Sequence, residues 1–130
     1  MKTLRMVLYL EAALFAVTGT LLALVPGWVL ETVVGLPGTS DHIWIRATGI
    51  LAFTVALLMV LVAQNAEQAW FWTWAFIFAQ GNLALLFLLK ALFGFTEPEW
   101  FWWAGAAAGA VMTGLLLLGV ARAYPEAPDR

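Results

Sequence analysis

The sequence contains no cysteine and a single histidine, His42. Without cysteine the chain cannot form disulfides, thiolate nucleophiles, iron–sulfur clusters or cysteine-based zinc sites. One histidine per copy also excludes a haem held by two histidines and a histidine-rich metal site within one chain. We therefore expect no metal centre and no cofactor.

Charged residues are scarce: they make up 11% of the 130 residues, with six Lys or Arg against eight Asp or Glu. No basic cluster is present to hold phosphates, so we do not expect the chain to bind nucleic acid. Hydrophobic residues reach 64%, whereas soluble proteins carry roughly 45–50%. Because a soluble protein of this length could not bury so much apolar surface, we expect lipid to surround most of the chain.

Four continuous apolar segments are long enough to cross a bilayer, which needs about 20 residues of helix. They cover residues 4–25, 43–63, 69–92 and 99–121. Unbroken apolar runs favour helices over barrel strands, and short connections make neighbouring helices antiparallel. The sequence thus predicts an all-α membrane protein, a four-helix up-down bundle in one domain (1–123) followed by a polar tail (124–130).

The segments between the spans carry turn and capping signals. The long connection, residues 26–42, places apolar Trp28 and Val33 around Glu31; this pattern predicts a short amphipathic helix at the membrane interface, ended by Gly35. Asn65 is expected to cap the third span. The first apolar run is longer than the core of a signal peptide and no clear cleavage site follows it, so we expect it to be retained as a span.

The positions of the basic residues indicate an orientation. An even number of spans places both termini on one side, and the residues near them include Lys2, Arg5, Arg122 and Arg130. The positive-inside rule predicts that this side is the cytoplasm. All eight tryptophans are then expected to anchor the chain at the two interfaces, with Trp28, Trp44, Trp100, Trp102 and Trp103 outside and Trp70, Trp72 and Trp74 inside. The alternative is a cofactor cage or an aromatic substrate site formed by some of them.

Polar side chains within spans are the usual indicators of function in membrane proteins. Glu11 lies two turns into the first span, and Gln80 and Asn82 lie near the middle of the third, where they are candidates to hydrogen-bond its carboxyl. One interpretation is that a protonated Glu11 holds helices together through Gln80. The other is that Glu11, with Gln80 and Asn82, forms the proton or solute site of a transporter.

Arg46 and Lys90 lie near the outer ends of the second and third spans, with Asp41 at a similar level. Long basic side chains near a helix end extend their charge to the interface. This favours anchoring and surface ion pairs for both residues. The alternative is an outer-leaflet site for an anionic headgroup or substrate, formed by Arg46, Lys90 and Asp41.

Gly105 and Gly109 form a Gly-x-x-x-Gly pattern in the fourth span, which allows close approach of another helix. That helix belongs either to the same bundle or to another chain. The only serine is Ser40, and no phosphate-binding loop, dinucleotide fingerprint or zinc-protease motif occurs. We therefore expect no catalytic residues and no enzymatic activity.

The run from Asp41 to Ile50 follows a Leu36-Pro37 loop and opens the second span. It resembles a pattern in small, mostly uncharacterised bacterial four-helix membrane proteins similar to the DoxX-like group, in which an R-x-x-G step opens the second helix. Arg46 and Gly49 are the matching positions. The resemblance implies a bacterial inner membrane. Because some DoxX-like proteins are subunits or partners of membrane redox assemblies, it also implies an accessory role.

The chain is also similar to small multidrug-resistance transporters, which have four spans and one glutamate in the first helix, here Glu11. This likeness implies proton-coupled export through Glu11. The long first connection, residues 26–42, departs from that family's pattern.

Taken together, these patterns predict a non-enzymatic accessory or interaction subunit of a larger membrane assembly. Its expected partners are membrane lipids and other membrane chains or further copies of itself. The alternatives are a proton-coupled transporter of a hydrophobic or cationic solute that uses Glu11, and a protein that binds a lipid or quinone near Arg46, Lys90 and the outer tryptophans.

Overall fold

The computed structural model describes residues 1–35, 42–94 and 99–126, and the regular structure in this part of the chain is helical. Four helical stretches are apolar enough and long enough to cross a membrane. The long helices are α1 (Lys2–Leu24), α3 (Ile43–Gln64), α5 (Thr73–Phe93) and α6 (Glu99–Ala123). The prediction of an all-α, four-helix membrane bundle is confirmed.

Short helical elements extend two of the spans. α4 (Ala66–Ala69) and the 3-10 turn η2 (Trp70–Trp72) lead into α5, and a second 3-10 turn, η3 (Tyr124–Glu126), follows α6. Asn65 precedes α4, but its side-chain amide donates to the Leu61 carbonyl oxygen at 3.0 Å and makes no capping bond to α4. The predicted cap is therefore wrong, because the Asn65 amide binds the last turn of α3 instead.

The first connection contains the short helix expected there. α2 (Pro26–Trp28) continues into the π-helix η1 (Val29–Val34). The helix ends at Gly35, whose φ of 80° is left-handed and whose N–H donates to the Leu30 carbonyl oxygen. Glycine adopts this conformation without the steric cost that a Cβ imposes. The short helix ended by Gly35 is confirmed, and Asp41 lies outside the described residues.

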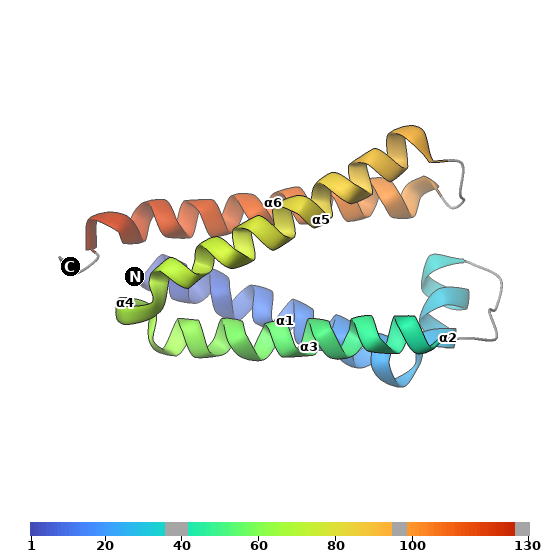
Figure 1. Cartoon of the computed structure of the whole chain (residues 1–130), viewed down its shortest axis with the longest axis horizontal. Helices are drawn as coiled ribbons and strands as arrows, with labels where there is room; N and C mark the ends of the chain where they lie inside the picture. The colour runs from blue at the N-terminus through green and yellow to red at the C-terminus, as the bar shows by residue number, and fades with distance from the viewer. Residues whose placement is uncertain (36–41, 95–98, 127–130) are drawn as a thin grey trace.

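The long helices run antiparallel, and both termini lie at the same end of the molecule (Figure 1). The Met1 amino group forms an ion pair with the Glu126 carboxylate, so the two ends of the described chain are in contact. This arrangement agrees with an even number of crossings.

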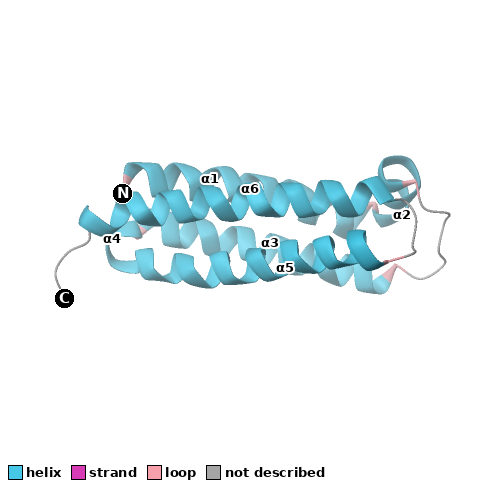
Figure 2. Ribbon diagram, turned by 90° about the horizontal axis from the view of Figure 1, so that it is seen from above, coloured by secondary structure: helices cyan, strands magenta, loops and turns pink. Residues whose placement is uncertain are grey.

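The four helices form two pairs. α1 packs along α3, α5 packs along α6, and the main contact between the pairs is that of α1 with α6. The pairs lie close together at the end that carries the termini and diverge toward the opposite end (Figure 1). Seen from above, all four helices still follow one common axis (Figure 2).

The hydrophobic core occupies only one half of this bundle. We call residues 1–12, 56–80 and 112–126 the closed half, and residues 13–35, 42–55, 81–94 and 99–111 the open half. Among the described residues, only Gly19, Pro26, Gly49 and Ala106 are buried in the open half. The closed half contains seven apolar residues that are 0% exposed: Leu4, Leu8, Met59, Ala63, Ala66, Leu116 and Ala123.

Candidate functional site

A buried hydrogen bond joins α1 to α5 where the closed half meets the open half. The Gln80 Nε2 atom donates to Glu11 Oε2 at 2.7 Å, and the two residues are 6% and 0% exposed. Because α1 and α5 belong to different helix pairs, this bond connects the pairs. The structure thus places Glu11 and Gln80 together.

Helical spacing explains how both side chains reach the core. Leu4, Leu8 and Glu11 follow each other at intervals of four and three residues, and such positions share one face of a helix. Thr73, Ile77 and Gln80 have the same spacing on α5 and are also buried. The polar pair therefore ends two buried stripes that are otherwise largely apolar.

The pair has no compensating positive charge within the described part of the chain. Arg5, the basic residue nearest to Glu11 in the sequence, is hydrogen-bonded at 3.5 Å to Glu67, and no ion pair involves Glu11. Two buried oxygen atoms, Glu11 Oε1 and Gln80 Oε1, lack a hydrogen-bond partner. A protonated carboxyl has one donor and an amide oxygen is an acceptor. The site can therefore hold the helix pairs together, and a proton on Glu11 would supply the donor that both oxygens lack.

Asn82 does not belong to this site, so the expectation that it joins Gln80 there is corrected. Residues two apart in a helix point about 200° away from each other. Asn82 is exposed, and its side-chain amide donates to the Phe78 carbonyl oxygen of the same helix at 2.9 Å. Only Gln80 of the two reaches Glu11.

Comparisons with models of protein families, with curated proteins and with solved structures found no match for this chain. Among residues 1–35, 42–94 and 99–126, no three His, Asp or Glu side chains are grouped as metal ligands.

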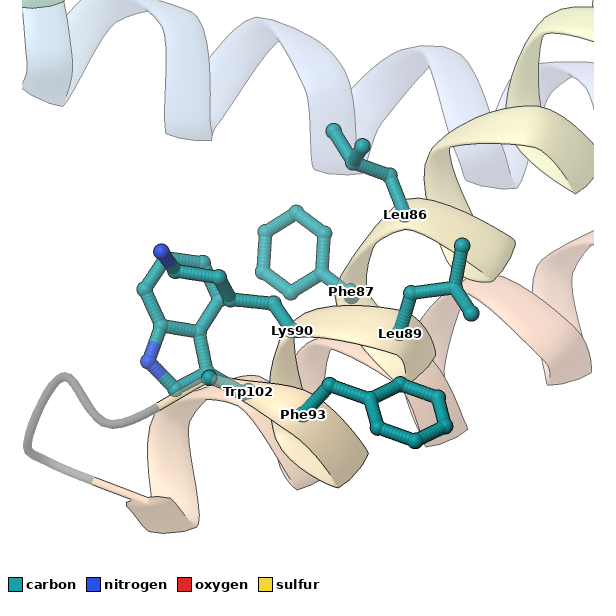
Figure 3. A pocket seen from close by; sticks show the side chains of 7 residues that line it. Leu86, Phe87, Leu89, Lys90, Phe93 and Trp102 are labelled. Atoms are coloured by element: carbon teal, nitrogen blue, oxygen red, sulfur yellow. The ribbon is translucent and has the colours of Figure 1, made fainter.

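Arg46 and Lys90 lie at the end opposite the termini but on different helix pairs, which diverge there (Figure 1). Arg46 is exposed, and no acidic residue in the described part of the chain forms an ion pair with it. Lys90 instead lies over the Trp102 ring of α6, with Nζ 5.7 Å from the ring centroid. It lines a cleft of about 540 Å³ between the end of α5 and the start of α6 (Figure 3). The structure therefore groups Lys90 with Trp102 and places Arg46 on the other pair.

Gly105 and Gly109 pack against α5 within the chain. A Cβ added at Gly105 would collide with the Phe87 ring, and one at Gly109 would lie 2.8 Å from the Ala84 Cβ atom. The Gly-x-x-x-Gly face is thus used for close approach of α6 to α5.

One close helix contact was not anticipated from the sequence. A Cβ added at Gly19 would lie 2.5 Å from the Gly49 carbonyl oxygen, and one at Gly49 would lie 2.6 Å from the Gly19 carbonyl oxygen. The backbones of α1 and α3 therefore nearly touch in the open half. The sequence carries no specific signal for it, because the dipeptide Thr-Gly at 18–19 and 48–49 also occurs at 113–114, where a Cβ on Gly114 would meet no atom within 4 Å.

Proposed function

We propose that this chain is a non-enzymatic accessory subunit of a larger membrane assembly, and that its open half receives the partner. The observation that carries this proposal is the loss of burial along a single helix face. Leu4 and Glu11 on α1 are 0% exposed, whereas Thr18, seven residues further along the same face, is exposed. The face continues, but the other helix pair no longer covers it.

Burial also decreases along α5, the helix whose Gln80 binds Glu11 of α1. Thr73, Ile77 and Gln80 are buried, whereas Ala84 and Phe87, which continue the stripe, are only half-buried. Both residues already pack on α6, Ala84 at Gly109 and Phe87 at Gly105, so a transmembrane helix of a partner could pack only on the parts of α1 and α5 that the neighbouring helices leave uncovered. A hydroxyl side chain such as Thr18 suits a close helix contact in a membrane.

The proposed location is the bacterial inner membrane, with both termini in the cytoplasm. Lys2, Arg5 and Arg122 lie at the end that carries the termini, which the positive-inside rule assigns to the cytoplasm. The resemblance of Arg46 and Gly49 to the DoxX-like pattern supports both a bacterial membrane and an accessory role.

The orientation can be tested by labelling. Because the chain has no cysteine, single cysteines introduced at Lys2 and Thr32 can report on which side of the membrane each position lies when they are treated with a membrane-impermeant maleimide. We expect labelling from the cytoplasm at position 2 and from the outside at position 32.

The partner can be tested by cross-linking in the native membrane. A photoreactive benzophenone residue at position 18 would report on the uncovered face of α1. The same residue at position 17 is the matched control, since Val17 lies at nearly the same depth and is 61% exposed but points about 100° away. We expect a discrete protein adduct from position 18 and only lipid adducts from position 17, and the same protein should co-purify in mild detergent.

Two results would contradict the accessory role. If position 18 gives only lipid adducts, lipid covers the open half and no partner helix is present. If the adduct has twice the mass of the chain, the open half serves self-association instead.

A second function, proton-coupled transport, is favoured by one specific observation. Glu11 Oε1 and Gln80 Oε1 are buried without partners, and a proton on Glu11 would satisfy both. As a transporter, the protein would release a proton from Glu11 and bind a hydrophobic cation in exchange. Vesicles containing the purified chain should then move tetraphenylphosphonium when a pH gradient is applied, and Glu11→Gln should abolish that movement. Absence of gradient-driven movement with the unmodified chain would exclude this function.

A further inference from the structure

The cleft between the end of α5 and the start of α6 combines one cation with an apolar wall. Its volume is about 540 Å³. Lys90 and Trp102 form the polar side, and Leu86, Phe87, Leu89 and Phe93 form the apolar side (Figure 3). A ligand that matches both sides must carry a negative charge at one end and a hydrocarbon chain at the other.

Among residues 1–35, 42–94 and 99–126, no carboxylate forms an ion pair with the Lys90 ammonium group. Its contact with the Trp102 ring is a cation–π contact, which leaves N–H donors of the ammonium group for another acceptor. Phosphate oxygens are suitable acceptors for a lysine that acts as a point charge.

Gly94 shapes the cleft by having no side chain. A Cβ at this position would collide with the Lys90 carbonyl oxygen and would lie 3.1 Å from the Lys90 Cδ atom. Glycine therefore leaves room for the Lys90 side chain to extend along the end of α5. The last turn of a helix also favours a cation, because its carbonyl groups lack donors.

The apolar wall is accessible from the lipid side of the bundle. Leu86 is 63% exposed, Leu89 is 45% exposed and Phe93 is 71% exposed. Because α5 ends at Phe93, Lys90 lies within one turn of the end of a membrane-spanning helix, where lipid headgroups are found. An acyl chain extending from such a headgroup into the bilayer would follow the wall from Phe93 toward Leu86.

We propose that this cleft binds one anionic phospholipid, with its phosphate at the Lys90 ammonium group and an acyl chain along Leu86, Leu89 and Phe93. A single cation matches the single negative charge of a phosphodiester headgroup. The apolar wall distinguishes a lipid from free phosphate, which would contact only Lys90. The cleft lies in the open half and includes Phe87, but binding of this lipid by the purified chain does not require the partner proposed there.

The proposal is tested by titrating the full-length, delipidated chain in detergent with phosphatidylglycerol and counting bound lipids by native mass spectrometry. We expect one phosphatidylglycerol to bind more tightly than phosphatidylcholine. Lys90→Gln should weaken that binding by about fivefold, the factor expected for one basic residue beside an anionic lipid. Lys90→Arg, which keeps the charge, should restore it.

Arg46→Gln is the matched control, because Arg46 is also an exposed basic residue at the same end of the bundle but does not line the cleft. It should leave the tightly bound phosphatidylglycerol unchanged. The proposal is overturned if Lys90→Gln binds as the unmodified chain does, if Arg46→Gln weakens binding equally, or if phosphatidylcholine binds as tightly. Displacement of the lipid by millimolar inorganic phosphate would also overturn it, since the site would then recognise an anion without its hydrocarbon chain.

Discussion

The closed and open halves of the bundle are built from the same four helices but are held together by different contacts. In the closed half, large apolar side chains such as Leu8, Met59 and Leu116 meet in a common core. In the open half, close contacts at small residues hold each pair together: Gly19 with Gly49 in one, Gly109 with Ala84 in the other. Contacts within each pair therefore continue in the open half, whereas the buried core shared by the two pairs ends near Glu11 and Gln80.

This difference shows that helical periodicity alone does not determine burial in a membrane bundle. The stripe that contains Leu4 and Glu11 continues to Thr18 without a change in spacing, yet burial stops. What changes is the distance between the two helix pairs, which diverge beyond this level (Figure 1). In lipid, uncovered apolar faces carry little penalty because acyl chains solvate them. The open half can thus remain stable without a partner and still offer a surface for one.

The largest expected effect is that of a matched substitution in each half. Leu8 is 0% exposed in the closed half, and Leu22, fourteen residues further along the same face of α1, is half-buried in the open half. Leu8→Ala should lower the free energy of unfolding by about 2–5 kcal/mol, because it leaves a cavity in a packed core. Leu22→Ala should cost less than about 1 kcal/mol, since it removes only partly buried surface. Titration with SDS, followed by circular dichroism, measures both; equal losses would show that the halves are packed alike.

The second prediction concerns the contact that holds α1 to α3 in the open half. Gly49→Ala should destabilise the chain by about 1–3 kcal/mol, because its Cβ must displace the backbone of α1. The control is Gly114→Ala, since a Cβ at Gly114 meets no atom within 4 Å. That substitution should be neutral or stabilise the helix by up to about 1 kcal/mol. The same SDS titration applies, and a loss at Gly114 equal to that at Gly49 would mean that glycine content, and not the α1–α3 contact, is being measured.

Much of this architecture could be predicted from the sequence, because hydropathy and span length depend on local composition. The four helices and the stop at Gly35 follow from such local signals. A hydrogen bond from Gln80 to Glu11 was one of two possibilities. To choose Gln80 over Asn82, one must know which face of α5 points toward α1, and the sequence does not give this. Sequence alone also could not reveal the contact between Gly19 and Gly49, because it depends on where α1 and α3 cross. The divergence of the two helix pairs was equally hidden, since apolar residues occupy both halves.

The smallest expected effect lies at the boundary between the halves. Glu11→Ala removes the hydrogen bond from Gln80 and leaves a buried amide unpaired, which should cost about 1–2 kcal/mol of unfolding free energy. Glu11→Gln should stay within about 0.5 kcal/mol of the unmodified chain, because two amides form reciprocal hydrogen bonds in the same space. Asn82→Ala, on the exposed side of α5, is the control and should change stability by less than about 0.5 kcal/mol. If Glu11→Gln is as damaging as Glu11→Ala, the bond between the pairs requires an ionised carboxylate. A neutral contact between Glu11 and Gln80 then does not hold the two helix pairs together.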